Sequence, residues 1–444
     1  MTMSTSDLGA TAERLLDLAH QAGAEEVQVR AERETERRVS FERGALHLAT
    51  AGAETRFSIR VHKDQRLGAV QTNSVSDDDL REAVRAALDL ARFSPPDQHL
   101  TMPAARPFRP TTRRYDPALA ALDAGGLQRL ASRYLGALKR DPRVSVESGS
   151  VSWEVGEICI ANSYGVRASD TWTHAAWTAL VEGIDGDEVT SFDYESGGAF
   201  ALAGIDERIV ADGEQLAGNV LATFGAGKGI TYKGPVLLTP RAVGELLLEP
   251  LEFHLSGLSV LYGKSSLGDD RRDTAIASPL LTVRDDPSDL MLAGATPFDD
   301  EGVPTQPLDL VRAGRLVTHI ENAYSAKRRG RPLTGHARLG LHAAVVEPGF
   351  TSAAELARGA TPILAVHRFS GNVTPASGDF SGIAKSSHLL MPDGERRPVR
   401  ETMIAGNFFD ALRGIVAVGE ASAIADGSFR APHVLVDGIS VTSE

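Results

Sequence analysis

Hydrophobic residues in the first half of the chain recur with two different periods. A stripe through Leu15, Leu16 and Ala19 has helical spacing and predicts a helix over residues 6–22, which Gly23 ends. Other stretches alternate apolar and polar residues with a period of two, as strands with one buried face do. These stretches cover residues 27–31, 38–48, 55–61 and 67–71.

A second predicted helix follows these strands. Ser76 and Asp79 form a capping box, and the helical spacing stops at Ser94, before two prolines. Further prolines mark an extended segment over residues 95–120, where we place a sub-boundary. The first half is therefore expected to be an α/β domain with helices and an antiparallel sheet. Its remaining predicted elements are a helix at 127–139 and strands at 144–155, 157–162, 171–181 and 189–194.

A glycine-rich cluster at residues 224–229 separates the two halves. A phosphate-binding loop needs Ser or Thr after its Gly-Lys pair, whereas Gly229 follows Lys228 here. We interpret the cluster as a linker and expect domains over residues 1–227 and 228–444. The second half opens with an apolar helix at 241–258, and short strands divided by turns follow. This pattern predicts a β-rich barrel or sandwich with one buried helix, and an α+β fold overall.

Composition narrows the classes of partner. Lys and Arg total 46 against 59 Asp and Glu, a formal net charge of −13. A negative surface repels phosphate backbones and anionic lipids, so we expect no nucleic acid and no membrane as a partner. The N-terminal residues lack a signal-peptide pattern and no long apolar run follows, so a cytoplasmic protein is expected. The single cysteine, Cys159, excludes a disulfide framework.

Common catalytic motifs are missing from the sequence. None of the 12 histidines belongs to an H-E-x-x-H pair, and there is no G-x-S-x-G elbow. His336 and His342 are six residues apart and are expected to be structural. On the helix at 241–258, Glu245, Glu249 and Glu252 have i, i+4, i+7 spacing. They form either an acidic or metal-adjacent functional face or a solvated stripe on an amphipathic helix.

Longer motifs follow this helix. The most extended runs from Ser370 to Gly382 and reads SGNVTPASGDFSG, and a shorter one, Asn162–Gly165, lies in the first half. With their neighbours these motifs resemble the TldD/PmbA (TldE) family of peptidase-related proteins, also called modulators of DNA gyrase. The resemblance covers nearly the whole chain. Its other segments are residues 280–287, 298–304, 334–338, 347–349 and 398–407.

The resemblance also locates a missing metal motif. TldD-type members look like zinc peptidases with a His-Glu-three residues-His helix and a late cysteine ligand. The matching positions here are Leu248, Glu249 and Phe253, and no cysteine follows Cys159. Leucine and phenylalanine have no lone pair for zinc. The resemblance therefore implies the TldE/PmbA branch, with no cofactor in this chain and zinc in a TldD-like partner.

The same resemblance implies a role for this chain. It would be the non-catalytic subunit of a heterodimeric zinc metallopeptidase that cleaves unfolded or small peptides, and alone it could form a homodimer. We expect it to shape the peptide chamber and to bind peptide by strand addition. The glycines of the turn Gly378–Gly382 fit a β-bulge or hairpin as well as they fit a binding loop. The predicted substrate- or partner-binding residues are Ser370, Gly371, Asn372, Gly378, Asp379, Phe380 and Ser381.

Two further functions fit the same residues. One is an autonomous peptidase with an atypical site built from Glu249, Glu252 and His254. The other is a non-enzymatic, protein-binding regulator, as the name gyrase modulator implies. Metal content of the isolated chain separates the first alternative from the partner-subunit interpretation, and co-purifying proteins separate the second.

Overall fold

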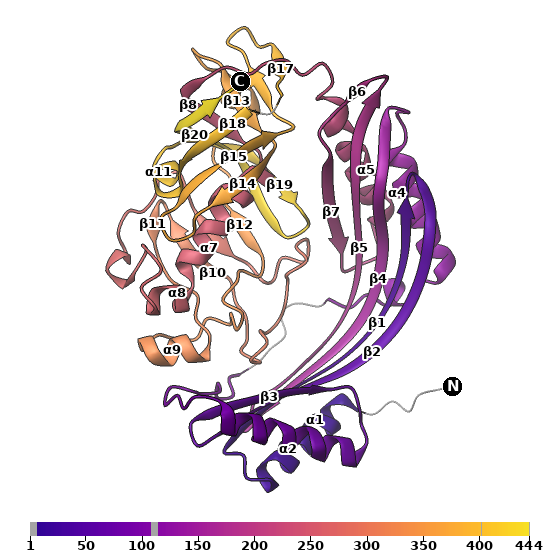
Figure 1. Cartoon of the computed structure of the whole chain (residues 1–444), viewed down its shortest axis with the longest axis vertical. Helices are drawn as coiled ribbons and strands as arrows, with labels where there is room; N and C mark the ends of the chain where they lie inside the picture. Colours follow the sequence, from indigo (N-terminus) through magenta and orange to yellow (C-terminus); the bar gives the residue numbers. More distant parts are fainter. Residues whose placement is uncertain (1–6, 108–113, 401, 444) are drawn as a thin grey trace.

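The computed structural model describes residues 7–107, 114–400 and 402–443. The alternating stretches of the first half form one curved antiparallel sheet, with strand order β3-β2-β1-β4-β5-β6 and β7 paired with β5 (Figure 1). The predicted stretch 38–48 contains the β1–β2 turn at Arg43 and Gly44. The strands are β1 Glu26–Glu42, β2 Ala45–Lys63, β3 Arg66–Thr72, β4 Val144–Asn162, β5 Arg167–Asp185, β6 Glu188–Val189 and β7 Asp193–Ala199.

The predicted strands at 144–155 and 157–162 are one strand, β4. Gly156 does not interrupt it, because this glycine makes room for the Trp172 ring on the neighbouring strand β5. A Cβ atom at position 156 would lie 2.0 Å from that ring. The glycine therefore marks a close packing contact inside the sheet.

Two pairs of helices cover the two ends of this sheet. The helices α1 (Leu8–Gln21) and α2 (Asp77–Phe93) pack at one end, and α4 (Ala124–Leu138) and α5 (Ile205–Leu221) at the other. The short helix α3 (Pro117–Ala120) joins the second group. The predicted cap forms, since Ser76 Oγ accepts from the Asp79 N–H. The structure begins α1 at Leu8, and Ser6 lies outside the described residues.

The second half forms a 13-stranded mixed sheet that is open. Its longest path, β11-β10-β9-β12-β20-β8-β13-β16-β17, ends at two strands that do not pair with each other, so the sheet is not a closed barrel. The predicted α+β fold with a β-rich second half is confirmed. The strands are β8 Tyr232–Leu238, β9 Val283–Asp285, β10 Leu308–Arg312, β11 Arg315–Leu316, β12 Ala344–Val346, β13 Ile363–Val366, β14 Arg368–Val373, β15 Asp379–Lys385, β16 His388–Leu390, β17 Arg396–Pro398, β18 Thr402–Asn407, β19 Ile415–Ala425 and β20 Phe429–Thr442.

The apolar helix predicted at 241–258 is interrupted. It consists of α6 (Pro240–Val243), a π-helical turn η1 (Gly244–Leu248) and α7 (Glu249–Leu255), and the extended Ser256 ends it. The Glu249 N–H donates to the Gly244 carbonyl five residues back, and Pro250 has no N–H to continue an α-helical ladder. The prediction of a buried helix is confirmed. The other helices here are α8 Gly257–Leu261, η2 Asp269–Arg271, α9 Ala323–Arg329, α10 Ala353–Leu356 and α11 Phe408–Arg413.

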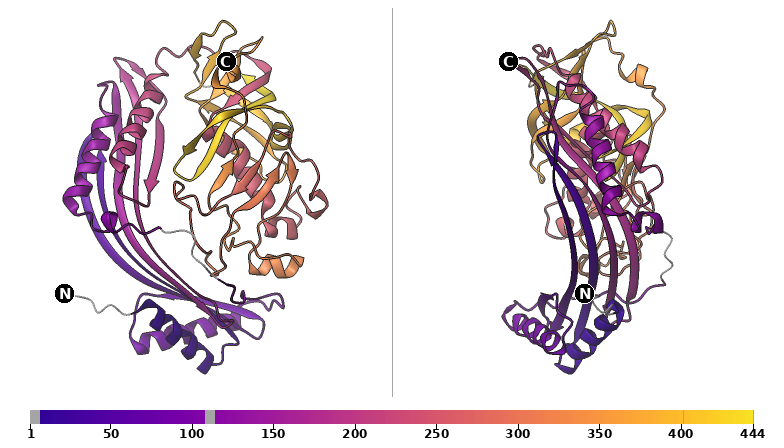
Figure 2. Two further views of the ribbon diagram at one scale, coloured as in Figure 1. Left: turned by 180° about the vertical axis from the view of Figure 1, so that it is seen from behind. Right: turned by 90° about the vertical axis from the view of Figure 1, so that its right-hand side faces the viewer.

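The two halves are arranged around the curvature of the first sheet. The second half lies on its concave side, and α4 and α5 cover the opposite face (Figure 2). Helices α1 and α2 lie at the far end of the long strands. Within the described ranges no helix is long and apolar enough to cross a membrane.

Candidate functional site

The helix with the degenerate zinc motif places its three key positions in different environments. Leu248 is buried, Glu249 is exposed and Phe253 is half-buried. Neither Leu248 nor Phe253 carries an atom that coordinates zinc, and one carboxylate cannot supply the three protein ligands of a catalytic zinc site. The side chains at these positions therefore do not fit the metal of the TldD-type motif.

The other two glutamates of the helix hold neighbouring segments. Glu245 Oε2 accepts from the backbone N–H of Phe369 at 2.5 Å, and Glu252 Oε2 accepts from that of Leu341 at 2.8 Å. Burial raises the pKa of Glu245 to about 6. The pKa of Glu249 is also raised, first by burial and then by the Glu252 carboxylate. Glu245 and Glu252 thus tie β14 and the loop at 340 to the helix.

His254 belongs to an aromatic core. Its ring is fully buried and stacks on Phe408 at an interplanar angle of 12°, with Phe409 also in contact at 4.9 Å between ring centroids. Its Nδ1 accepts from the Ser266 N–H at 3.2 Å. Burial lowers the pKa of His254 to about 4, so the ring is neutral and packs as an aromatic residue.

Three side chains from two segments of the second half lie close together. Asp285, His336 and His342 each offer one ligand atom within 4.8 Å of the others, and could hold a metal. Each of the three side chains already has a hydrogen-bond partner within the chain. His336 Nε2 lies 3.0 Å from Asp285 Oδ2, Ala343 N–H donates to Asp285 Oδ1, and His342 Nε2 lies 2.7 Å from the Gly335 carbonyl. Burial opposes ionisation of Asp285, but the bond to His336 and the nearby His342 keep its pKa below the ordinary value.

The predicted peptide-binding residues lie on the β14–β15 hairpin. Its β14 strand pairs only with β15, so its other edge is free among the described residues. Five of the seven predicted residues are exposed, whereas Phe380 is in the core and Gly378, at φ 78°, packs against Phe408 and Phe409. The exposed residues are Ser370, Gly371, Asn372, Asp379 and Ser381.

The free edge of β14 has a defined pattern of backbone donors. The Phe369 N–H points away from β15, since it donates to Glu245. Backbone groups alternate along an antiparallel strand, so the N–H groups of Gly371 and Val373 point to the same free side. The Thr374 N–H fits this alternation, because it donates inward to the Asp379 carbonyl at 2.8 Å. An extended peptide placed beside β14 would meet these two donors.

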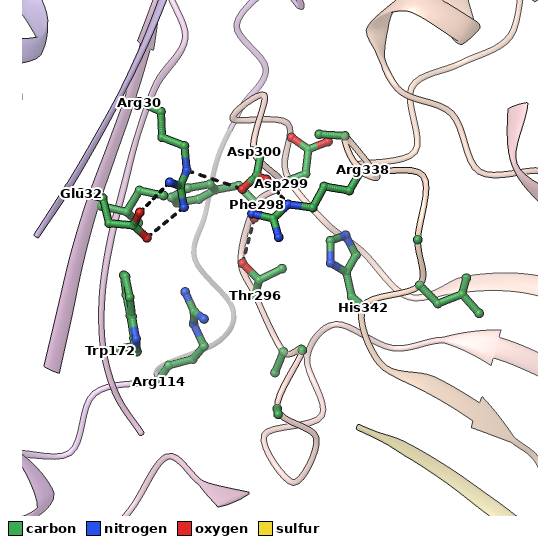
Figure 3. Close-up of a pocket in the computed structure, with 17 residues that line it drawn as sticks. Arg30, Glu32, Arg114, Trp172, Thr296, Phe298, Asp299, Asp300, Arg338 and His342 are labelled. Carbon is green, nitrogen blue, oxygen red and sulfur yellow. Dashed lines mark hydrogen bonds and ion pairs between the residues drawn. The ribbon is translucent and has the colours of Figure 1, made fainter. Parts of the chain in front are cut away.

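A cavity of about 370 Å³ lies between the two halves of the chain (Figure 3). Arg30 from β1 bridges Glu32 at 2.6 Å and Asp300 at 3.6 Å, and Asp300 also pairs with Arg338. Asp299 is buried in its wall, and burial together with the nearby Glu301 raises its pKa to about 7. The sequence does not indicate this cavity, because its walls come from distant segments of the chain, such as β1 with Arg30 and the loop with Asp300.

A second contact between the halves is a buried cluster of charges around Arg241. The Arg241 side chain is 4% exposed and lies among four carboxylates, two from β7, one from its own helix and one from the β19–β20 turn. No short-range pattern identifies such a group. The nitrogen–oxygen distances are 3.7 Å to Asp193, 4.0 Å to Glu195, 3.4 Å to Glu245 and 3.7 Å to Asp426.

Comparison with known proteins shows what this arrangement resembles. Residues 231–443 match the PmbA/TldA metallopeptidase C-terminal domain, and residues 27–91 match domain 1 of the same metallopeptidases. The metalloprotease PmbA of Escherichia coli O157:H7 is 28% identical over 422 residues, covering 90% of this chain and 89% of the relative. A PmbA homologue from Haemophilus influenzae is 28% identical over 384 residues, covering 82% and 80%.

Solved structures agree on the fold. TldE from Thermococcus kodakarensis superposes with a TM-score of 0.86 at 22% identity, covering 97% of this chain and all of the other. Two domain models match, the relatives align over most of their length, and the fold is shared with a solved structure. The chain belongs to the TldD/PmbA family.

Proposed function

We propose that this chain is the non-catalytic, TldE-like subunit of a two-component zinc peptidase. The observation that carries the proposal is the side-chain set where η1 meets α7. There Leu248 and Phe253 stand at the two histidine positions around Glu249, and no cysteine follows Cys159. Three protein ligands are the minimum for a catalytic zinc, and the positions of the zinc motif supply one carboxylate. The metal, and with it the activation of water and the peptide carbonyl, would belong to a TldD-like partner.

The part assigned to this chain is to hold the substrate. A free strand edge binds an extended peptide through main-chain hydrogen bonds, which are available in unfolded peptides of any sequence. The outward N–H groups of Gly371 and Val373 supply such donors. The exposed side chains of Ser370 and Asn372 lie beside them on β14. The preceding donor, on Phe369, is taken by Glu245, so the peptide site begins at residue 370.

The first test compares the isolated chain with a mixture. The chain is purified alone and together with a TldD-like protein from the same source, and zinc content and cleavage of an unfolded peptide are measured. We expect no cleavage by this chain alone, and cleavage by the mixture above that of the partner alone. Stoichiometric zinc with cleavage by the lone chain would instead support an atypical site at Glu249, Glu252 and His254.

A second test addresses strand addition. The substitution Val373→Pro removes one outward N–H and leaves the ladder to β15 intact. We expect kcat/KM of the mixture to fall about 10-fold, the effect of losing one buried hydrogen bond of roughly 1.4 kcal/mol. Asn372→Ala is the matched control, since it removes an exposed side chain and keeps every backbone donor. Equal activity of the two variants would count against strand addition at β14.

A further inference from the structure

Asp285, His336 and His342 form a cluster of metal-ligand side chains at the end of β9, beside the segment 334–343. One ligand atom from each residue lies within 4.8 Å of those of the other two. Asp285 and His336 are fully buried, and His342 is half-buried. Imidazole and carboxylate groups are common zinc ligands. They can bind an ion only if their hydrogen bonds within the chain leave one lone pair on each.

The Thr334 hydroxyl determines which nitrogen of His336 carries the hydrogen. Thr334 Oγ1 donates its one hydrogen to the Glu321 carbonyl oxygen at 3.1 Å and accepts from the Glu321 N–H at 2.7 Å. His336 Nδ1 lies 3.0 Å from both the hydroxyl and the carbonyl oxygen of Thr334. Both oxygens are then acceptors, so Nδ1 donates. The neutral ring has its lone pair on Nε2, which faces Asp285 Oδ2 at 3.0 Å. Two acceptors at this distance need a proton or a metal ion between them.

His342 and Asp285 also keep one lone pair each. His342 Nε2 lies 2.7 Å from the Gly335 carbonyl oxygen and donates to it, so the lone pair of this ring is on Nδ1. Asp285 Oδ1 accepts from the Ala343 N–H at 2.6 Å, which leaves Oδ2 for the ion. Histidines that bind a metal usually donate their second ring N–H to a carbonyl or a carboxylate, as both histidines do here.

The surroundings of the cluster favour a cation. The Glu252 carboxylate interacts electrostatically with both Asp285 and His336 and adds a second negative charge nearby. His342 also lines the cavity of about 370 Å³ between the two halves, which gives an ion and its water ligands a path to the cluster (Figure 3). The 3.0 Å between Asp285 Oδ2 and His336 Nε2 suits two neighbouring ligands of one zinc ion, whose bonds are about 2.0–2.2 Å long.

We propose that Asp285, His336 and His342 bind one Zn²⁺ ion through a carboxylate oxygen and two imidazole nitrogens. Zinc takes such a mixed ligand set, whereas Mg²⁺ prefers oxygen ligands. The ion takes the place of the proton between His336 and Asp285, and water fills its remaining positions from the cavity. It ties β9 to the segment 334–343, which forms part of the cavity wall. This site is separate from the degenerate motif at Leu248–Phe253, and it assigns no catalysis to this chain.

The experiment titrates Zn²⁺ into the full chain after removal of bound metal with a chelator, and calorimetry measures the affinity. The wild-type chain is expected to bind one ion with a Kd of about 1 µM or lower. Asp285→Asn keeps the shape of the side chain but removes its charge, and we expect the Kd to rise at least about 100-fold. His319→Gln is the matched control and should leave the Kd unchanged. His319 is also buried and has its Nε2 2.7 Å from a carbonyl oxygen, that of Leu267, but it lies outside the cluster.

His342→Gln provides a second variant, since this half-buried residue can be replaced with less effect on the fold. It should weaken zinc binding by a similar factor. Far-UV circular dichroism checks that each variant is folded. In thermal melts, Zn²⁺ should raise the Tm of wild type and His319→Gln, but not that of Asp285→Asn.

Two results would overturn the proposal. One is a wild-type chain that binds no Zn²⁺ at about 100 µM. The other is binding that Asp285→Asn or His342→Gln leaves unchanged, which would mark an adventitious ion at the surface. Neither result depends on peptide cleavage. Zinc at this site without cleavage by the lone chain is compatible with the proposed function, so the two proposals fail separately.

Discussion

Among the described residues, the free strand edges of β2 and β14 differ in length and in charge. The β2 edge is long, uncharged and exposed on both faces over Ala45–Ala53. The β14 edge spans only Arg368–Val373, and a carboxylate of the neighbouring helix occupies its first outward donor. Buried charges surround the start of β14, whereas exposed pairs such as Arg56–Glu54 flank β2.

The difference bears on the peptide site that we propose at β14. A short edge with a fixed start suits a peptide that must also leave. The β14 edge is held by side chains of both halves, so changes near it should disturb the fold. Changes along β2 should leave the fold intact, and matched substitutions in the two regions test this contrast.

The largest effect is expected from removing the buried guanidinium. Arg241→Met removes a guanidinium that faces four carboxylates and is 4% exposed, and of these Asp193 keeps Arg368 as a second partner. We expect the free energy of unfolding to fall by about 3–5 kcal/mol. Chemical denaturation monitored by tryptophan fluorescence measures the change.

The matched change near β2 is Arg56→Met. This arginine pairs with Glu54 at 2.7 Å, but its side chain is 43% exposed. Exposed ion pairs contribute little to stability, so the free energy of unfolding should stay close to that of wild type. Similar losses for Arg56→Met and Arg241→Met would contradict the contrast between the two regions.

A smaller effect is expected from paired glycine substitutions. A Cβ atom at position 371 would lie 2.5 Å from the Gly382 Cα and from the Ser381 carbonyl oxygen, both backbone atoms of β15. Gly371→Ala should therefore lower the free energy of unfolding by about 2–3 kcal/mol. Position 52 on β2 has no atom within 4 Å of such a Cβ, so Gly52→Ala should change it by less than about 0.5 kcal/mol. Thermal melts at one protein concentration compare the two.

The smallest effect is a pH dependence of stability that comes from the buried cluster around Arg241. Burial, and next the Asp426 carboxylate, raise the pKa of Glu195 to about 7 from an ordinary value of 4.5. The folded state therefore binds a proton that the unfolded state releases. This stabilisation is complete below about pH 4.5 and is lost as the pH rises through 7.

The variant Glu195→Gln removes this pH-dependent stabilisation, because the amide cannot ionise. It keeps a side-chain oxygen that accepts from the Asp426 N–H. As the pH rises from 5 to 7.5, the free energy of unfolding of the variant should increase relative to wild type by on the order of 1 kcal/mol, a value reduced for partial exposure. Parallel stability curves for the two proteins over this range would show that Glu195 does not titrate there. Urea denaturation at each pH provides the measurement.

Local patterns in the sequence identified most of the first half. Helices α1, α2 and α4 follow from apolar spacing and caps, since both are set by residues a few positions apart. The inability of Leu248 and Phe253 to coordinate a metal also follows from the sequence, because side-chain chemistry does not depend on the fold. Family motifs placed the hairpin at 370–382 among the segments of interest before its geometry was known.

Other features depend on contacts between distant residues. His367 bonds to Asp193 across 174 positions. Asp285 meets His336 and His342 only when strand β9 packs beside the segment that carries both histidines. The open edge of the second sheet and the π turn in the apolar helix were likewise missed. Whether a strand is an edge, and whether a carboxylate is buried, is decided by what packs beside it, and alternation along one strand carries no record of its neighbours.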